Sequence, residues 1–141
     1  MGVTGSSQTI ALDSNIFIRS LDDSTSLGEK ARKFLEQLKD SSRIFISAMV
    51  LEEFFVRVYK EKREKEIPIL LEFITLGGLC TIINIDQAIA LAAARLRAEI
   101  PSLRAPDALH IASAIESGAK IFYTTDKRLP RKINKLAIKL I

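Results

Sequence analysis

The sequence lacks the features that define several protein classes. It has one cysteine, Cys80, among 141 residues, which excludes an internal disulfide and favours a reducing, cytoplasmic setting. No apolar run is long enough to span a bilayer and no basic segment precedes an apolar signal core, so we expect no membrane association. Repeats and inter-domain linkers are also absent. We therefore expect a flexible leader over residues 1–8 and a single domain over residues 9–141.

The composition is typical of a globular domain with a basic surface. Hydrophobic residues make up 48% of the chain and charged residues 27%, which excludes a disordered chain and allows a core without disulfides. The net charge is +4 and the isoelectric point is about 9.3. This modest positive charge would suit a polyanionic partner, but it does not identify one.

Strand-like and helix-like segments alternate along the chain. The strand-like runs are short and apolar, and we expect them at residues 9–12, 43–46, 79–85, 120–123 and 137–140. The helices between them begin at capping-type or proline residues, namely a capping box of Ser26 with Glu29, then Ser47, Pro68, Asp86 and Pro106. This alternation predicts an α/β fold with a mostly parallel sheet of about five strands and helices on both faces. The almost wholly apolar run 79–85 should be covered on both faces.

Four acidic residues occupy positions that such a fold would bring together. Asp13 and Asp126 follow the first and fourth strands, and the carboxyl ends of parallel strands form one edge of the sheet. Glu53 and Asp107 lie in the first two turns of helices that should begin at the same edge. Clustered carboxylates repel one another unless a cation neutralises them, and Mg²⁺ or Mn²⁺ prefers such hard oxygen ligands. The pattern therefore predicts a divalent-metal site of a kind that commonly acts on phosphates.

Each of these acids also has a simpler interpretation. Asp13 is a common turn residue, Asp107 complements the dipole of its helix, and Asp126 can pair with the basic residues that follow it. Glu53 has a neighbour, Glu52, near the same apolar helix stripe, and helical periodicity does not choose between the two. We favour the metal site because all four acids fall at one predicted edge.

Three other groups of residues are candidates for supporting roles. His110, the only histidine, follows Asp107 by one turn, and we interpret it as a packed or supporting residue because it has no credible serine or cysteine nucleophile as partner. Phe55 and Tyr59 lie beside an apolar stripe and would suit a partner helix or a subunit interface, so we expect a homodimer. The best candidates for phosphate contacts follow the last acid and are Lys127, Arg128, Arg131 and Lys132.

Four short fragments contain the acidic residues. They are Leu12-Asp13-Ser14-Asn15, Ile46-Ser47 with Glu53 six residues after the serine, the run 105–114 that begins Ala105-Pro106-Asp107, and Thr124-Thr125-Asp126. In this order they resemble the PIN-domain ribonucleases, the family that includes the VapC-type toxins. The resemblance covers about residue 10 to the C-terminus and implies a three-layer α/β/α fold. Carried over by position, it implies a catalytic and metal-binding quartet of Asp13, Glu53, Asp107 and Asp126, supported by Asn15 and Thr124.

The resemblance implies an Mg²⁺- or Mn²⁺-dependent endoribonuclease that hydrolyses RNA phosphodiesters, with an antitoxin protein as a further partner if the chain is a toxin. One alternative is a catalytically silent PIN-fold module for RNA binding or assembly. The four carboxylates argue against it, because a scaffold would gain stability by losing them. A second alternative is a phosphoacceptor receiver domain, but the third strand ends without the acceptor aspartate that such a domain needs.

Overall fold

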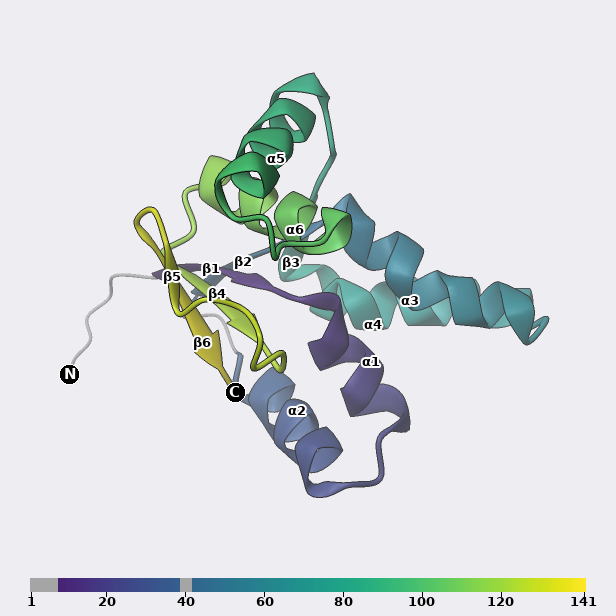
Figure 1. Cartoon of the computed structure of the whole chain (residues 1–141). Helices are drawn as coiled ribbons and strands as arrows, with labels where there is room; N and C mark the ends of the chain where they lie inside the picture. The colour runs from purple at the N-terminus through teal and green to yellow at the C-terminus, as the bar shows by residue number, and fades with distance from the viewer. Residues whose placement is uncertain (1–7, 39–41) are drawn as a thin grey trace.

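The protein is a three-layer α/β/α domain built on one mostly parallel sheet (Figure 1). The computed structural model describes residues 8–38 and 42–141. The sheet has six strands in the order β3-β2-β1-β4-β6-β5, and only the β5–β6 pair is antiparallel. The predicted parallel α/β fold is thus confirmed, with one strand more than expected. The leader predicted over residues 1–8 lies outside the described residues except for Gln8, which begins the first strand.

The elements follow one another in the alternation that the sequence predicts. The strands are β1 (Gln8–Leu12), β2 (Ser42–Ser47), β3 (Cys80–Ile83), β4 (Ile121–Thr124), β5 (Lys132–Ile133) and β6 (Leu136–Leu140). The helices are α1 (Ser14–Asp22), α2 (Ser26–Gln37), α3 (Ala48–Lys60), α4 (Ile67–Ile74), α5 (Gln87–Glu99) and α6 (Ala105–Glu116). Short 3₁₀ turns at Glu64–Glu66 and Leu76–Gly78 precede and follow α4.

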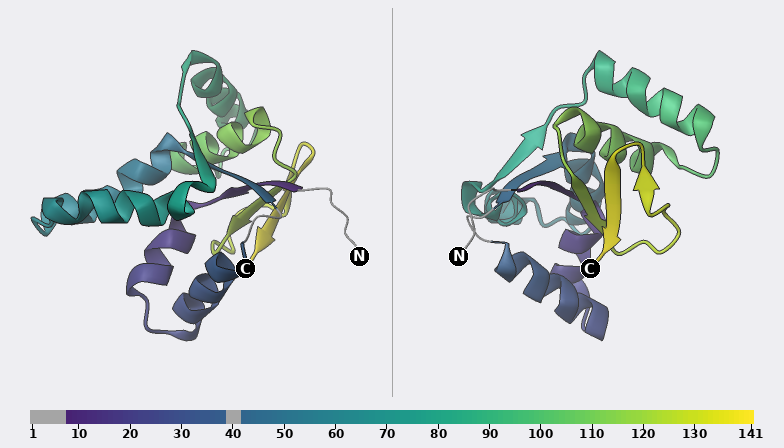
Figure 2. Two further views of the ribbon diagram at one scale, coloured as in Figure 1. Left: turned by 180° about the vertical axis from the view of Figure 1, so that it is seen from behind. Right: turned by 90° about the vertical axis from the view of Figure 1, so that its left-hand side faces the viewer.

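Alternate residues of the central strands pack into two separate hydrophobic cores, one on each face of the sheet. In β1, Ile10 and Leu12 pack into a cluster with α1, α2, α3 and α4, whereas Ala11 packs into a cluster with α5 and α6. In β4, Ile121 and Phe122 divide in the same way. This two-residue period is that of a strand covered on both faces. Figure 2 shows the result, with α5 and α6 on one side of the sheet and α1 and α2 on the other.

The strand order places a topological switch point between β1 and β4. From β1 the chain moves outward through β2 to β3, and from β4 it moves the other way to the edge strand β5 and then returns to β6, which lies between β4 and β5. At such a point the crossovers leave in opposite directions, so a crevice opens beyond the carboxyl ends of the two strands. Asp13 follows β1 and Asp126 follows β4, and therefore both acids lie at this crevice.

Several local predictions were wrong. Helix α1 was not predicted, and neither was the two-residue strand β5. Strand β3 forms an edge of the sheet with Thr81 exposed, so it is not covered on both faces. Helix α2 begins at Ser26 with Thr25 at the N-cap position and has no side-chain cap, which excludes the proposed capping box.

Other local predictions are confirmed. Asp86 caps α5 by accepting a hydrogen bond from the Ile89 amide at 2.9 Å, and Pro68 lies in the first turn of α4. Cys80 is buried as expected, and burial raises the pKa of its thiol to about 12. Within residues 8–38 and 42–141, no helix has the length and apolar character needed to cross a bilayer.

Candidate active site

All four predicted acids line one cavity at the switch point. The cavity has a volume of about 520 Å³, and Asp13, Glu53, Asp107 and Asp126 contribute to its wall. Asp13 and Asp107 are buried, while Glu53 and Asp126 are partly exposed. The convergence expected from strand ends and helix starts is therefore present in the structure.

Asp13 is the most enclosed of the four carboxylates, with 4% of its surface exposed. Its Oδ1 accepts a hydrogen bond from the Ser14 amide at 2.8 Å, and its Oδ2 accepts one from the Thr124 hydroxyl at 2.8 Å. Burial raises the pKa of this carboxyl, although the nearby His110 and the two hydrogen bonds act in the opposite direction. A bound cation would offset the cost of keeping Asp13 ionised in this position.

Asn15 and Thr124 join the ends of the two central strands. The Asn15 amide nitrogen lies 3.2 Å from both Asp13 Oδ2 and Thr124 Oγ1, and its oxygen accepts a hydrogen bond from the Thr125 amide at 3.1 Å. The Thr124 hydroxyl also accepts a hydrogen bond from the Asp126 amide at 3.0 Å. The structure thus places both predicted supporting residues against Asp13, where they fix its orientation.

Glu53 reaches the cavity from the second turn of α3, whereas Glu52 is exposed and lines a different pocket. Glu53 Oε1 accepts hydrogen bonds from Ser14 Oγ at 2.8 Å and from His110 Nε2 at 2.6 Å. Burial acts to raise the pKa of Glu53, but the hydrogen bond and charge of His110 outweigh it and the pKa is lowered. The carboxylate is therefore held ionised.

His110 is buried on α6 between two partners. Its Nδ1 lies 2.7 Å from Ser47 Oγ, and its Nε2 bonds to Glu53 and lies 3.7 Å from Asp13 Oδ1. Burial alone would lower the pKa of this imidazole, but the carboxylates of Glu53 and Asp13 outweigh it and raise the pKa. Ser47 occupies the N-cap position of α3 yet bonds to His110 rather than to the helix, so the predicted cap is wrong.

Arginines accompany the other two acids. Asp107 lies in the first turn of α6, and its Oδ2 accepts a hydrogen bond from Arg104 Nε at 3.3 Å. Arg128 holds both oxygens of Asp126 through Nε and Nη2, each at 3.0 Å. This hydrogen bonding lowers the pKa of Asp126 despite partial burial. Asp126 is thus engaged in the ion pair that its simpler interpretation predicted, while still lining the cavity.

The structure separates the four predicted RNA-binding residues into two pairs. Lys127 and Arg128 line the acidic cavity, whereas Arg131 and Lys132 do not. Lys132 lies in β5, the outermost strand, and its partner Ala137 pairs with Ile121 at the start of β4. Lys132 is therefore level with the end of β4 opposite the cavity.

Two cavity arginines were missed by the sequence reasoning. Arg19 belongs to the unpredicted helix α1 and contacts Thr125 Oγ1 at 3.2 Å, and Arg104 precedes α6. The sequence signal for Arg104 was its position three residues before Asp107, a spacing that brings side chains together in a helical turn.

The donor set fits a hard divalent cation. Ligand atoms of Asp13, Glu53 and His110 lie within 4.8 Å of one another, and Asp107 and Asp126 line the same cavity outside this group. Oxygen-rich sites of this kind suit Mg²⁺ or Mn²⁺. Both nitrogens of His110 have hydrogen-bond partners and each has at most one lone pair, whereas a carboxylate oxygen can accept a hydrogen bond and still bind a cation, so the carboxylates are the better ligands.

Comparison with known proteins agrees with this geometry. The family model for the PIN domain matches residues 10–135. The chain belongs to the PIN domain family. No curated protein matches the sequence. The four fragments that suggested the family each contribute a residue to the acidic cavity of this PIN domain.

Solved structures with the same fold include a toxin–antitoxin complex and a toxin. VapBC2 from Rickettsia felis, bound to a DNA fragment of its promoter, has a TM-score of 0.70 and 22% identity, and the match covers 94% of this chain and 98% of that one. A toxin–antitoxin complex from Klebsiella pneumoniae has a TM-score of 0.68 and 25% identity, with 91% and 95% covered. VapC20 from Mycobacterium tuberculosis, a toxin that cleaves the sarcin–ricin loop, has a TM-score of 0.69 and 13% identity, with 84% and 91% covered.

Proposed function

We propose that this PIN domain is a metal-dependent endoribonuclease. The observation that carries the proposal is the convergence of four carboxylates, one of them almost fully buried, in a single cavity at the switch point of the sheet. A structural domain would gain nothing from this repulsion, whereas a phosphodiesterase needs anionic ligands for a cation. Membership of the PIN family supports the same conclusion and leaves the receiver-domain alternative without support.

The residues divide the chemistry among them. Asp13, Asp107 and Asp126 would hold Mg²⁺ or Mn²⁺ directly or through water, and Glu53 would complete the site or orient the attacking water. When bound, the ion supplies positive charge that stabilises the phosphodiester transition state and activates the water. Asn15 and Thr124 keep Asp13 oriented, while the cationic rim of Arg19, Arg104, Lys127 and Arg128 draws RNA toward an otherwise repulsive cavity.

The test of this proposal compares two aspartates at helix starts. Asp107→Asn should abolish cleavage of single-stranded RNA in Mn²⁺ and leave the thermal unfolding temperature within a few degrees. Asp86→Asn is the matched control, because Asp86 starts the neighbouring helix α5, does not line the cavity, and asparagine caps helices equally well. EDTA should stop the wild-type reaction. Cleavage that survives EDTA or Asp107→Asn would overturn the proposal, and RNA binding without any cleavage would favour the silent PIN-fold module.

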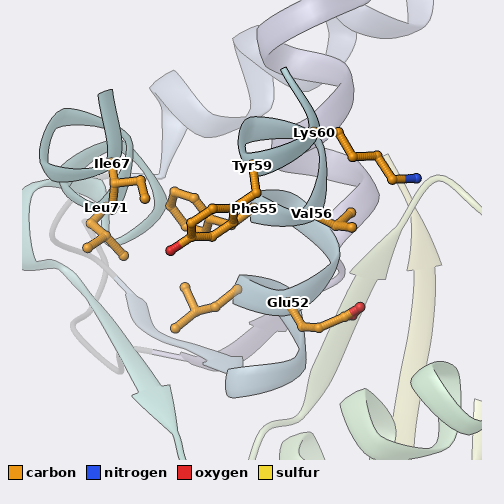
Figure 3. A pocket seen from close by; sticks show the side chains of 8 residues that line it. Glu52, Phe55, Val56, Tyr59, Lys60, Ile67 and Leu71 are labelled. Carbon is orange, nitrogen blue, oxygen red and sulfur yellow. The ribbon is translucent and has the colours of Figure 1, made fainter. Parts of the chain in front are cut away.

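We further propose that the domain acts as the toxin of a toxin–antitoxin pair in the cytoplasm and binds its antitoxin through an apolar groove between α3 and α4. The groove has a volume of about 620 Å³. Figure 3 shows Phe55 and Tyr59 reaching from α3 toward Ile67 and Leu71 of α4, with Val56 beside them. Val56 and Tyr59 are 45% and 58% exposed, which is a large apolar surface for a monomer to leave in water.

An amphipathic helix suits a groove of this shape, since its apolar stripe would cover the exposed side chains and its polar face would remain solvated. The K. pneumoniae structure, a toxin–antitoxin complex with the same fold, supports an antitoxin as the occupant. The predicted homodimer is the competing occupant, because a second copy could cover the same side chains.

A further inference from the structure

We propose that His110 is a positioning residue that holds Glu53 so that only one of its carboxylate oxygens is left for the reaction. This inference deepens the proposed nuclease function and rests on it for its kinetic test. The starting observation is an asymmetry of Glu53, because Oε1 accepts both the Ser14 and the His110 hydrogen bonds. Within the described residues Oε2 has no hydrogen-bond partner, and Glu53 lines the acidic cavity.

The geometry favours positioning by His110 over direct metal binding. A carboxylate oxygen can only accept, so the hydrogen on His110 Nε2 points at Glu53 Oε1 across 2.6 Å. Two ligands of one octahedral Mg²⁺ ion, each at about 2.05 Å, would be about 2.9 Å apart. Nε2 and Oε1 are closer together than two ligands of one ion would be, and a hydrogen lies between them. His110 Nε2 and Glu53 Oε1 therefore do not bind the same ion.

His110 is itself held on every side. Its side chain is 1% exposed, and its ring stacks on Phe122 of β4 with an interplanar angle of 28°. Ser47, at the end of β2, bonds to Nδ1 at 2.7 Å. A ring fixed at both nitrogens cannot rotate without breaking one hydrogen bond, so its Nε2 is a rigid reference point for Glu53.

Glu53 needs such a reference because its side chain is long and partly exposed. Three rotatable bonds separate its carboxylate from α3, and 29% of the side chain is exposed. Without His110 the carboxylate would keep only the Ser14 hydrogen bond and could rotate either oxygen into the cavity. Catalytic groups must be held close to their productive geometry, so this freedom would reduce the reaction rate and the cation affinity.

The experiment is a double-mutant cycle between His110 and Glu53 with two readouts, the kcat for RNA cleavage and the Mn²⁺ affinity measured by calorimetry. His110→Ala should lower kcat by about 10- to 100-fold with little change in KM, and should weaken Mn²⁺ binding by about 10-fold. In the Glu53→Gln background the same substitution should have almost no further effect on either readout. Ser47→Ala removes the anchor of Nδ1 and should reproduce the defect in milder form, so it serves if His110→Ala does not fold.

Ser113→Ala is the matched control. Ser113 lies on the same helix, is equally buried, and bonds only to the Leu109 carbonyl at 2.8 Å, so both readouts should remain within about two-fold of wild type. Equal losses from His110→Ala in the wild-type and Glu53→Gln backgrounds would overturn the proposal, because His110 would then act independently of Glu53, through packing or through Asp13, which lies 3.7 Å from Nε2. A wild-type protein that binds Mn²⁺ but cleaves no RNA would refute the nuclease function, while the coupling in Mn²⁺ affinity would still decide the role of His110.

Discussion

The separation of the basic residues into two pairs predicts how RNA binding depends on salt. Lys127→Gln with Arg128→Gln removes two charges from the cavity wall, whereas Arg131→Gln with Lys132→Gln removes two charges from the segment around the outer strand. Each phosphate contact on a single strand adds about 0.7 to the slope of log affinity against log salt. The cavity pair should therefore reduce the slope by about 1.4, and the outer pair should reduce it by close to zero.

The magnitude is measurable at ordinary salt concentrations. The quantity to compare is the ratio of wild-type affinity to cavity-variant affinity. With a slope difference of about 1.4, this ratio should be about seven-fold larger at 50 mM salt than at 200 mM salt. Fluorescence anisotropy with labelled single-stranded RNA in an Asp107→Asn background would report binding without cleavage. Lys127→Gln alone leaves the Arg128–Asp126 pair intact and should give about half of the slope change. Equal slopes for the two double variants would contradict this prediction, because RNA would then approach over another surface.

Two further predictions concern α3. Glu53→Gln should lower kcat by about 100-fold or more. Glu52 is exposed and lies outside the acidic cavity, so Glu52→Gln should leave kcat within about two-fold of wild type. The reverse order would show that the wrong glutamate has been assigned. Val56→Asp in the apolar groove should prevent co-purification with the product of the adjacent open reading frame, whereas Leu91→Asp on α5, at a residue 63% exposed, should not. Conversion of a homodimer to a monomer by Val56→Asp, with that partner still bound, would instead identify the groove as a subunit interface.

The fold was predictable where the local sequence pattern and the rules for connecting parallel strands gave the same answer. Short apolar runs separated by helical patterns are enough to predict parallel strands, and parallel strands place Asp13 and Asp126 at one edge. Helix α1 was missed because it begins at Ser14, with only Asp13 between it and β1, and therefore lacks the loop that usually separates a strand from the next helix. Strand β5 was missed because two residues are too few to show a period, and only its pairing with β6 defines it.

The covering of β3 was misjudged for a different reason. An apolar run predicts burial but says nothing about the place of the strand in the sheet. The order β3-β2-β1-β4-β6-β5 depends on which side of β1 each later strand joins the sheet. Contacts between helices and strands that are distant in sequence determine that side. The edge position of β3 is thus a tertiary property, and Thr81, in the middle of the strand, was the residue that could have indicated it.

The choice between Glu52 and Glu53 shows where local reasoning ends. Helical periodicity puts both glutamates near one apolar stripe, and only the family spacing favoured Glu53. The structure provides a physical basis in two hydrogen bonds to the Glu53 carboxylate, from Ser14, 39 residues away, and from His110, 57 residues away. His110 in turn depends on Ser47, 63 residues away at the end of another strand. The orientation of Glu53 is therefore determined by four elements that meet only at the carboxyl edge of the sheet, so a change in any one of Ser14, Ser47 or His110 should be transmitted to the same carboxylate.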